Sequence, residues 1–79
     1  MKAKEMFEKL GYEQEIIDEQ LIYSTKDLQA NIEYQIIFYL DDKSFEAITD
    51  NCIHANNINM QELQAINKQI EELGWLKDE

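Results

Sequence analysis

The stretch Ile32-Glu33-Tyr34-Gln35-Ile36-Ile37-Phe38-Tyr39-Leu40 decides the fold, because side chains alternate between the two faces of a β-strand. On that period, one face of the strand is a continuous apolar row: Ile32, Tyr34, Ile36, Phe38 and Leu40. The other face carries Glu33, Gln35, Ile37, Tyr39 and Asp41. We therefore predict a sheet whose apolar row is covered by the remaining elements of the chain.

Two shorter segments predict the strands beside this one. Asp41-Asp42-Lys43-Ser44 is typical of a turn, and residues 45–49 (Phe-Glu-Ala-Ile-Thr) return as a strand. So short a connection makes the two strands antiparallel neighbours. Residues 21–25 (Leu-Ile-Tyr-Ser-Thr) have the aromatic and β-branched content of another strand, and residues 26–31 supply a polar turn.

Two segments leave alternatives open. Residues 12–19 are acidic except for Ile16-Ile17, and they form either a connection or a short strand that enters the sheet. Residues 50–57 are polar and rich in asparagine. Within them, Cys52-Ile53 either continues the preceding strand or begins a loop.

A short amphipathic helix is predicted at residues 3–10. Its apolar residues follow the i, i+3, i+4, i+7 spacing of one helical face: Ala3, Met6, Phe7 and Leu10. Gly11 ends the helix because glycine adopts the left-handed conformation at little steric cost. Tyr12 can then fold back onto the last turn.

A longer helix is predicted from Asn59 to Leu73. Asn59 is a good N-cap, and Glu62 stands three residues later, as in a capping box. Ile58 precedes the cap and is placed to pack on Leu63. We expect one face to carry Leu63, Ile66, Ile70 and Leu73, and we expect Gly74 to end the helix so that Trp75-Leu76 folds back over the core.

These elements predict one α+β domain over residues 1–79. We expect a small antiparallel sheet of three strands, or of four, in the order α-β-β-β-α. The N- and C-terminal helices should pack together on one face of this sheet.

Composition narrows the function classes. Seventeen acidic residues against seven lysines give a formal net charge of −10, which disfavours direct nucleic-acid binding and binding to anionic membranes. No stretch approaches the roughly 18 apolar residues that cross a bilayer, and residues 1–5 lead into no signal-peptide core. Cys52 stands alone and cannot form an internal disulfide. We expect a cytoplasmic protein.

Nothing in the sequence predicts an active site, a metal or a cofactor. Cys52 and His54 would share one side of a strand, but a zinc site needs three or four ligands and no other Cys or His exists. The acids Asp41, Asp42, Glu46 and Asp50 lack the glycine and spacing of a calcium loop. An enzyme or metal protein that uses Asp50, Cys52 and His54 is therefore the least favoured hypothesis.

The second face of the sheet is the candidate interface. If both helices cover one face, Ile37 and Tyr39 lie on the other face, together with Ile48. Scattered exposed apolar groups are ordinary, whereas a contiguous patch marks a dimer or partner surface.

Both ends of the chain resemble a family of small acidic proteins carried by prophages and mobile elements of Gram-positive bacteria. The resemblance rests on Ala3-Lys4-Glu5-Met6-Phe7-Glu8-Lys9-Leu10-Gly11-Tyr12 and on Leu63-Gln64-Ala65-Ile66-Asn67-Lys68-Gln69-Ile70-Glu71-Glu72-Leu73-Gly74-Trp75. These are helix-ending patterns, and the resemblance implies no activity and no functional residues.

Two hypotheses about function follow. The first is a non-enzymatic accessory protein of phage or mobile-element origin that acts by protein–protein contact, either as a homodimer or with another protein. The alternative is an acidic inhibitor that imitates DNA and occupies a basic host protein. DNA mimicry requires the acidic residues to gather on one surface.

Overall fold

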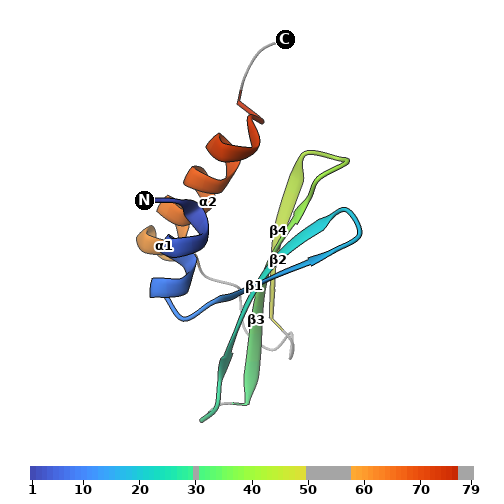
Figure 1. Cartoon of the computed structure of the whole chain (residues 1–79). Coiled ribbons are helices and arrows are strands. Elements are labelled where there is room, and N and C mark those ends of the chain that lie inside the picture. Colours follow the sequence, from blue (N-terminus) through green and yellow to red (C-terminus); the bar gives the residue numbers. More distant parts are fainter. Residues whose placement is uncertain (30, 50–57, 77–79) are drawn as a thin grey trace.

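The computed structural model describes residues 1–29, 31–49 and 58–76. Helix α1 (Ala3–Lys9) comes first, and four strands follow it: β1 (Glu13–Ile17), β2 (Gln20–Asp27), β3 (Ile32–Tyr39) and β4 (Ser44–Thr49). Helix α2 (Met60–Leu73) is last in the order (Figure 1). The α+β class is confirmed, and the acidic segment after Tyr12 is a fourth strand rather than a connection. In the described part of the chain, neither helix is long and apolar enough to cross a membrane.

The strands form one antiparallel sheet in the order β1-β2-β3-β4. Each strand lies beside its neighbour in sequence, so every connection is a hairpin turn. The register places Ile36 of β3 between Tyr23 of β2 and Ala47 of β4. The predicted strands at residues 21–25, 32–40 and 45–49 are confirmed with small shifts of their ends.

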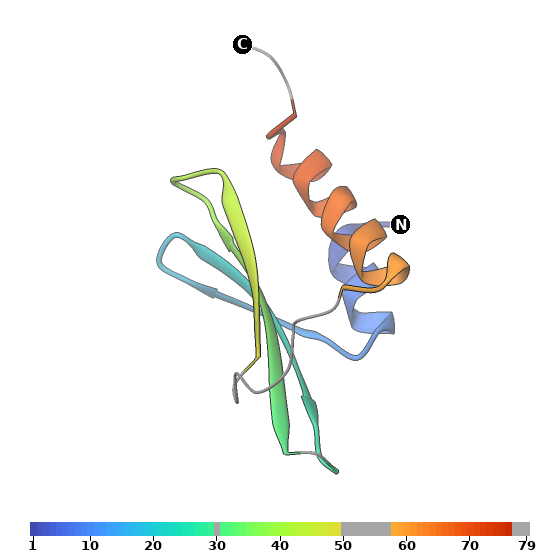
Figure 2. The same ribbon diagram turned by 180° about the vertical axis from the view of Figure 1, so that it is seen from behind.

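Both helices lie on the same side of the sheet, as the views from the front and from behind both show (Figures 1 and 2). The core between the layers is a cluster of buried side chains from α1, the sheet and α2: Phe7, Tyr12, Leu21, Tyr23, Ile36, Phe38, Ala65 and Ile66. Its centre is aromatic. The ring of Phe7 stacks on Tyr23 with centroids 3.9 Å apart, and Phe38 stands edge-on to Tyr23 at 6.2 Å.

The two helices end in the same way. Gly11 has a φ of +93° and Gly74 a φ of +75°, so each adopts the left-handed conformation. The next residue then donates its backbone N–H to the last turn: Tyr12 to the carbonyl of Phe7 at 3.0 Å, and Trp75 to that of Ile70 at 3.2 Å. Tyr12 belongs to the core cluster and Trp75 packs against it, which confirms that both endings fold back onto the apolar layer.

The capping box of α2 is confirmed, and the buried face of this helix is as predicted except at Leu63. Asn59 Oδ1 accepts the backbone N–H of Glu62 at 2.7 Å, and Glu62 Oε1 accepts that of Asn59 at 2.9 Å. Ala65, Ile66 and Gln69 are buried, and the predicted residues Ile70 and Leu73 are partly buried against the core, whereas Leu63 is 39% exposed. The prediction was wrong about Leu63 alone: the buried face includes Gln69, whose hydrogen-bond partner in the sheet is described below.

Candidate functional site

The face of the sheet away from the helices is the candidate interface, and we call it the open face. Strand alternation and the register place on it the apolar side chains Ile17, Ile22, Ile37, Tyr39 and Ile48. The same face carries the charged residues Glu13, Glu15, Lys26, Glu33 and Glu46. The three residues predicted from the sequence, Ile37, Tyr39 and Ile48, therefore do share one face.

The apolar side chains at the centre of the open face are almost completely covered by the residues around them. Ile22 and Ile37 are directly paired and each is only 7% exposed. Their row continues outward to Glu15 on one side and Glu46 on the other. Ile48, at 39% exposed, and Ile17, at 46%, offer more surface at opposite edges of the sheet. Ile37 is thus buried at the centre of the open face, and Ile17 and Ile48 are the most exposed apolar side chains of this face, with Tyr39 partly exposed.

Sequence reasoning did not place Ile17 and Ile22 on this face. Ile22 was assigned to a strand, but its register against Ile37 depends on pairing that the sequence does not state. Ile17 lies in β1, the segment for which the sequence alone allows either a connection or a short strand. The available signal was the period of two in this segment, which places Glu13, Glu15 and Ile17 on one face and Gln14 and Ile16 on the other.

Tyr39 is fixed on the open face by Glu46. Its hydroxyl donates a hydrogen bond of 2.5 Å to Glu46 Oε1. This bond to a carboxylate raises the pKa of Tyr39, because loss of the proton would place two negative charges side by side. The ring is therefore held beside Ile37, the direct cross-strand neighbour of Glu46.

Hydrogen bonds connect side chains of α2 to Tyr23 in the sheet and to Tyr12, which directly precedes the sheet. The buried hydroxyl of Tyr23 donates to Gln69 Oε1 at 2.6 Å and accepts from Gln14 Nε2 at 3.0 Å. The hydroxyl of Tyr12 donates to Glu62 Oε2. The bond to Tyr23 explains why the polar side chain of Gln69 is buried, because each group satisfies the other there.

Alkaline pH should weaken this attachment. Burial, and then the bond to Glu62, raise the pKa of Tyr12 above its ordinary value of 10, and burial also raises that of Tyr23. A tyrosine whose pKa is higher in the folded state contributes stability that is complete below about pH 10 and is lost as pH rises toward the folded value. The free energy of unfolding, from urea titrations between pH 8 and 12, should therefore fall above about pH 10.

The control for this pH dependence is Tyr12→Phe. It removes one of the shifted groups, so its free energy of unfolding should fall less steeply than that of the wild type over the same range. Parallel curves for the two proteins would contradict the assignment to Tyr12.

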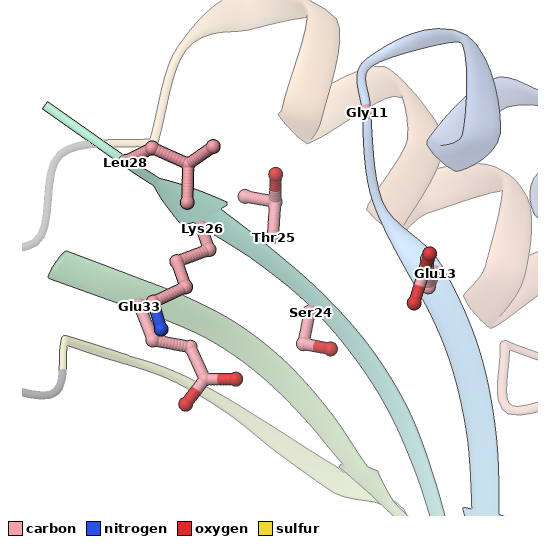
Figure 3. A pocket seen from close by; sticks show the side chains of 7 residues that line it. All are labelled: Gly11, Glu13, Ser24, Thr25, Lys26, Leu28 and Glu33. Atoms are coloured by element: carbon pink, nitrogen blue, oxygen red, sulfur yellow. The ribbon is translucent and has the colours of Figure 1, made fainter. Parts of the chain in front are cut away.

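A shallow groove of about 400 Å³ lies where β1 separates from β2 (Figure 3). The β1–β2 ladder starts at Glu13 and Ser24, and the chain before Glu13 turns away toward α1. The lining residues are Gly11, Glu13, Ser24, Thr25, Lys26, Leu28 and Glu33. The Lys26 side chain extends toward its cross-strand neighbour Glu33 (Figure 3). The lining offers hydroxyls and charges, and among the described residues that line the groove none is a histidine or cysteine that could activate the hydroxyls.

The other candidate residues give no assembled site. In the described ranges, no three His, Cys, Asp or Glu side chains are grouped so that they could hold a metal ion. Asp41 and Asp42 lie in the exposed β3–β4 turn, and Glu46 is bonded to Tyr39. Asp50, Cys52 and His54 lie outside the described residues.

Comparisons with protein-family models, with curated proteins and with solved structures found no match.

Proposed function

We propose that this chain is a non-enzymatic accessory protein of a phage or mobile element that acts by protein–protein contact through the open face. The observation that carries the proposal is the placement of both helices on one side of the sheet, which leaves the other side uncovered by them. Ile17, Tyr39 and Ile48 are the accessible apolar groups there. The resemblance of both chain ends to proteins of such elements supports the origin.

The charge of the open face favours a different protein over a second copy as the partner. Four glutamates and one lysine lie on this face. Two copies in face-to-face contact would bring eight carboxylates together, which costs free energy that the few exposed apolar groups do not recover. A partner with lysine or arginine around an apolar centre would meet Ile17 and Ile48 with its apolar groups and the glutamates with its charges.

DNA mimicry has less support from the arrangement of the acids. Each of the six elements carries at least one acidic residue: for example Glu8 in α1, Glu13 in β1 and Glu62 in α2. The turns add Asp18, Glu19, Asp41 and Asp42. A spread over the whole described surface differs from the single row of charges that imitation of a phosphate backbone requires.

The test is photo-crosslinking from the position of Ile48 in lysate of a host cell. A photoreactive residue at Ile48 should give one discrete crosslinked species of larger mass. The same residue at Lys9, on the solvent side of α1, is the matched control and should not give it. Addition of Ile17→Glu, on the same face as Ile48, should abolish the species while far-ultraviolet circular dichroism stays unchanged.

Two outcomes would contradict the proposal. One is the same crosslinked species from Ile48 and from Lys9, which would show that the contact does not belong to the open face. The other is a crosslink only to a second copy, together with a dimer in light scattering at micromolar concentration. That result would show that the open face binds a second copy of this chain rather than a different protein.

A further inference from the structure

A second apolar surface lies on the helix side of the sheet, at the end where α2 finishes. Four directly paired residues cross the whole sheet in one row, Ile16, Leu21, Phe38 and Phe45, one from each strand. The two central residues are buried, and the two outer ones are open: Ile16 is 65% exposed and Phe45 is 41% exposed. The helical layer therefore covers the middle of this row and leaves both ends accessible.

The end of α2 completes this surface. The ring of Phe38 has two aromatic neighbours, Trp75 at 6.1 Å and Phe45 at 5.6 Å between ring centroids. Trp75 is itself partly exposed, and Leu76 after it is exposed. We call the row together with Trp75 the distal strip. The β1–β2 and β3–β4 turns and the end of α2 lie toward this same end of the molecule, whereas the β2–β3 turn lies at the other end (Figures 1 and 2).

The rim of the distal strip is acidic. The β1–β2 turn carries Asp18 and Glu19, and the β3–β4 turn carries Asp41 and Asp42 with Lys43 as its one cation. The two turns are tied together, because the backbone N–H of Leu40 donates to the carbonyl of Glu19 at 2.9 Å. Four carboxylates against one ammonium thus stand on joined turns beside the exposed apolar groups.

We infer that the distal strip binds a cationic amphipathic helical segment of another protein. Apolar side chains on one helical face would cover Ile16, Phe45 and Trp75, and lysine or arginine at the margins would reach the carboxylates of the two turns. Four strands about 4.8 Å apart span about 14 Å, which accommodates about nine residues of helix. A second copy fits poorly, since its own distal strip has the same acidic rim.

This inference concerns the side of the sheet opposite the open face and does not rest on the proposed function. The two surfaces can be separated on the same strand, because Phe45 and Ile48 of β4 point to opposite faces and are 41% and 39% exposed. Ile16 and Ile17 of β1 form a second such pair.

The test uses the fluorescence of Trp75, the only tryptophan in the chain. The probe is a synthetic peptide of leucine and lysine, about 15 residues long, with leucines at helical i, i+3, i+4, i+7 spacing. Titration of the full chain with this peptide should shift the Trp75 emission in a saturable way. A peptide of the same composition in scrambled order should bind at least about tenfold more weakly, because it has the charge but no apolar face.

Matched variants locate the binding. Phe45→Glu should weaken binding at least about tenfold, whereas Ile48→Glu should leave it within about twofold. Both changes add the same negative charge, which attracts a cationic peptide, so a loss at Phe45 alone reports the lost apolar contact. Circular dichroism verifies folding, and Ile16→Glu against Ile17→Glu repeats the comparison at more exposed positions.

Any of three results would overturn the inference. The Trp75 emission could stay unchanged, or the scrambled peptide could bind as well as the amphipathic one. Ile48→Glu could also weaken binding as much as Phe45→Glu. A dimer in light scattering that Phe45→Glu dissociates would instead identify a second copy as the occupant. None of these results bears on the crosslink from Ile48, so the two proposals fail separately.

Discussion

Phe7→Ala is expected to lower the free energy of unfolding by about 3–5 kcal/mol, the usual cost of truncating a buried phenylalanine. Phe7 is completely buried, is stacked on Tyr23, and stands edge-on to Tyr12 at 5.6 Å. It is also the main anchor of α1, a helix of seven residues that is too short to be stable alone. A domain of this size has about 4–12 kcal/mol in total, so the variant should be close to unfolded at 37 °C.

Urea titration followed by far-ultraviolet circular dichroism measures this loss. Phe7→Leu is the control, because it keeps most of the volume and loses the aromatic contacts; it should cost about 1.5 kcal/mol or less. An alanine variant as stable as the leucine variant would contradict the central place of Phe7 in the core.

Tyr23→Phe is expected to cost about 1–3 kcal/mol, although it removes one oxygen atom and keeps the ring. The hydroxyl of Tyr23 lies between Gln69 Oε1 and Gln14 Nε2, and Gln69 is buried. Without the hydroxyl, the buried carboxamide oxygen of Gln69 has no hydrogen-bond donor, although its burial still keeps it from bonding to water. The loss should therefore exceed that of removing an exposed hydrogen bond.

A double-mutant cycle isolates this interaction. Gln69→Leu alone leaves the Tyr23 hydroxyl facing an apolar group, whereas Gln69→Leu combined with Tyr23→Phe removes both polar partners. The double variant should be more stable than the sum of the single losses predicts, by about 1 kcal/mol or more. Strict additivity in thermal and urea unfolding would show that Tyr23 and Gln69 do not act together.

Local signals made the helix ends and the central strands predictable. Gly11 and Gly74 were the only glycines, and both have the positive φ that their positions after a helical pattern required. Asn59 and Glu62 form the predicted capping box within four consecutive residues. The alternation in β3 identified its apolar face, and Ile36 and Phe38 are the most buried residues of that strand.

Strand β1 and one position on the buried face of α2 depended on pairing that the sequence alone does not state. Residues 13–17 have acids and isoleucines in an order that fits a strand only when β2 lies beside them. The turn after them contains Asp18 in the left-handed conformation, without the glycine or asparagine that usually signals it. In α2, the apolar pattern correctly placed Ile66, Ile70 and Leu73 at the core but also included Leu63, and it gave no sign that Gln69 is buried by its bond to Tyr23, 46 residues earlier in the chain.

The sequence predicted which side of the sheet carries the candidate interface, but not which of its side chains are accessible to solvent. Period-two alternation assigned Ile37, Tyr39 and Ile48 to the correct face. How much of each remains accessible depends on cross-strand neighbours, and Ile22 pairs with Ile37 and closes the centre. The distal strip was not predicted, because it combines residues from four strands with the end of α2.

The contact between α1 and α2 has a consequence for synthesis in the cell. The backbone N–H of Ala3 donates to Glu72 Oε2 at 2.8 Å, a bond that joins residues 69 positions apart. A ribosome synthesises the four strands before α2. The sheet can form at that stage, because it needs only hairpins between strands that are neighbours in sequence. The nascent protein should therefore leave the apolar row of β3 only partly covered until α2 has been synthesised. During that interval α1 alone shields the row, and the protein is most prone to aggregation or to capture by chaperones.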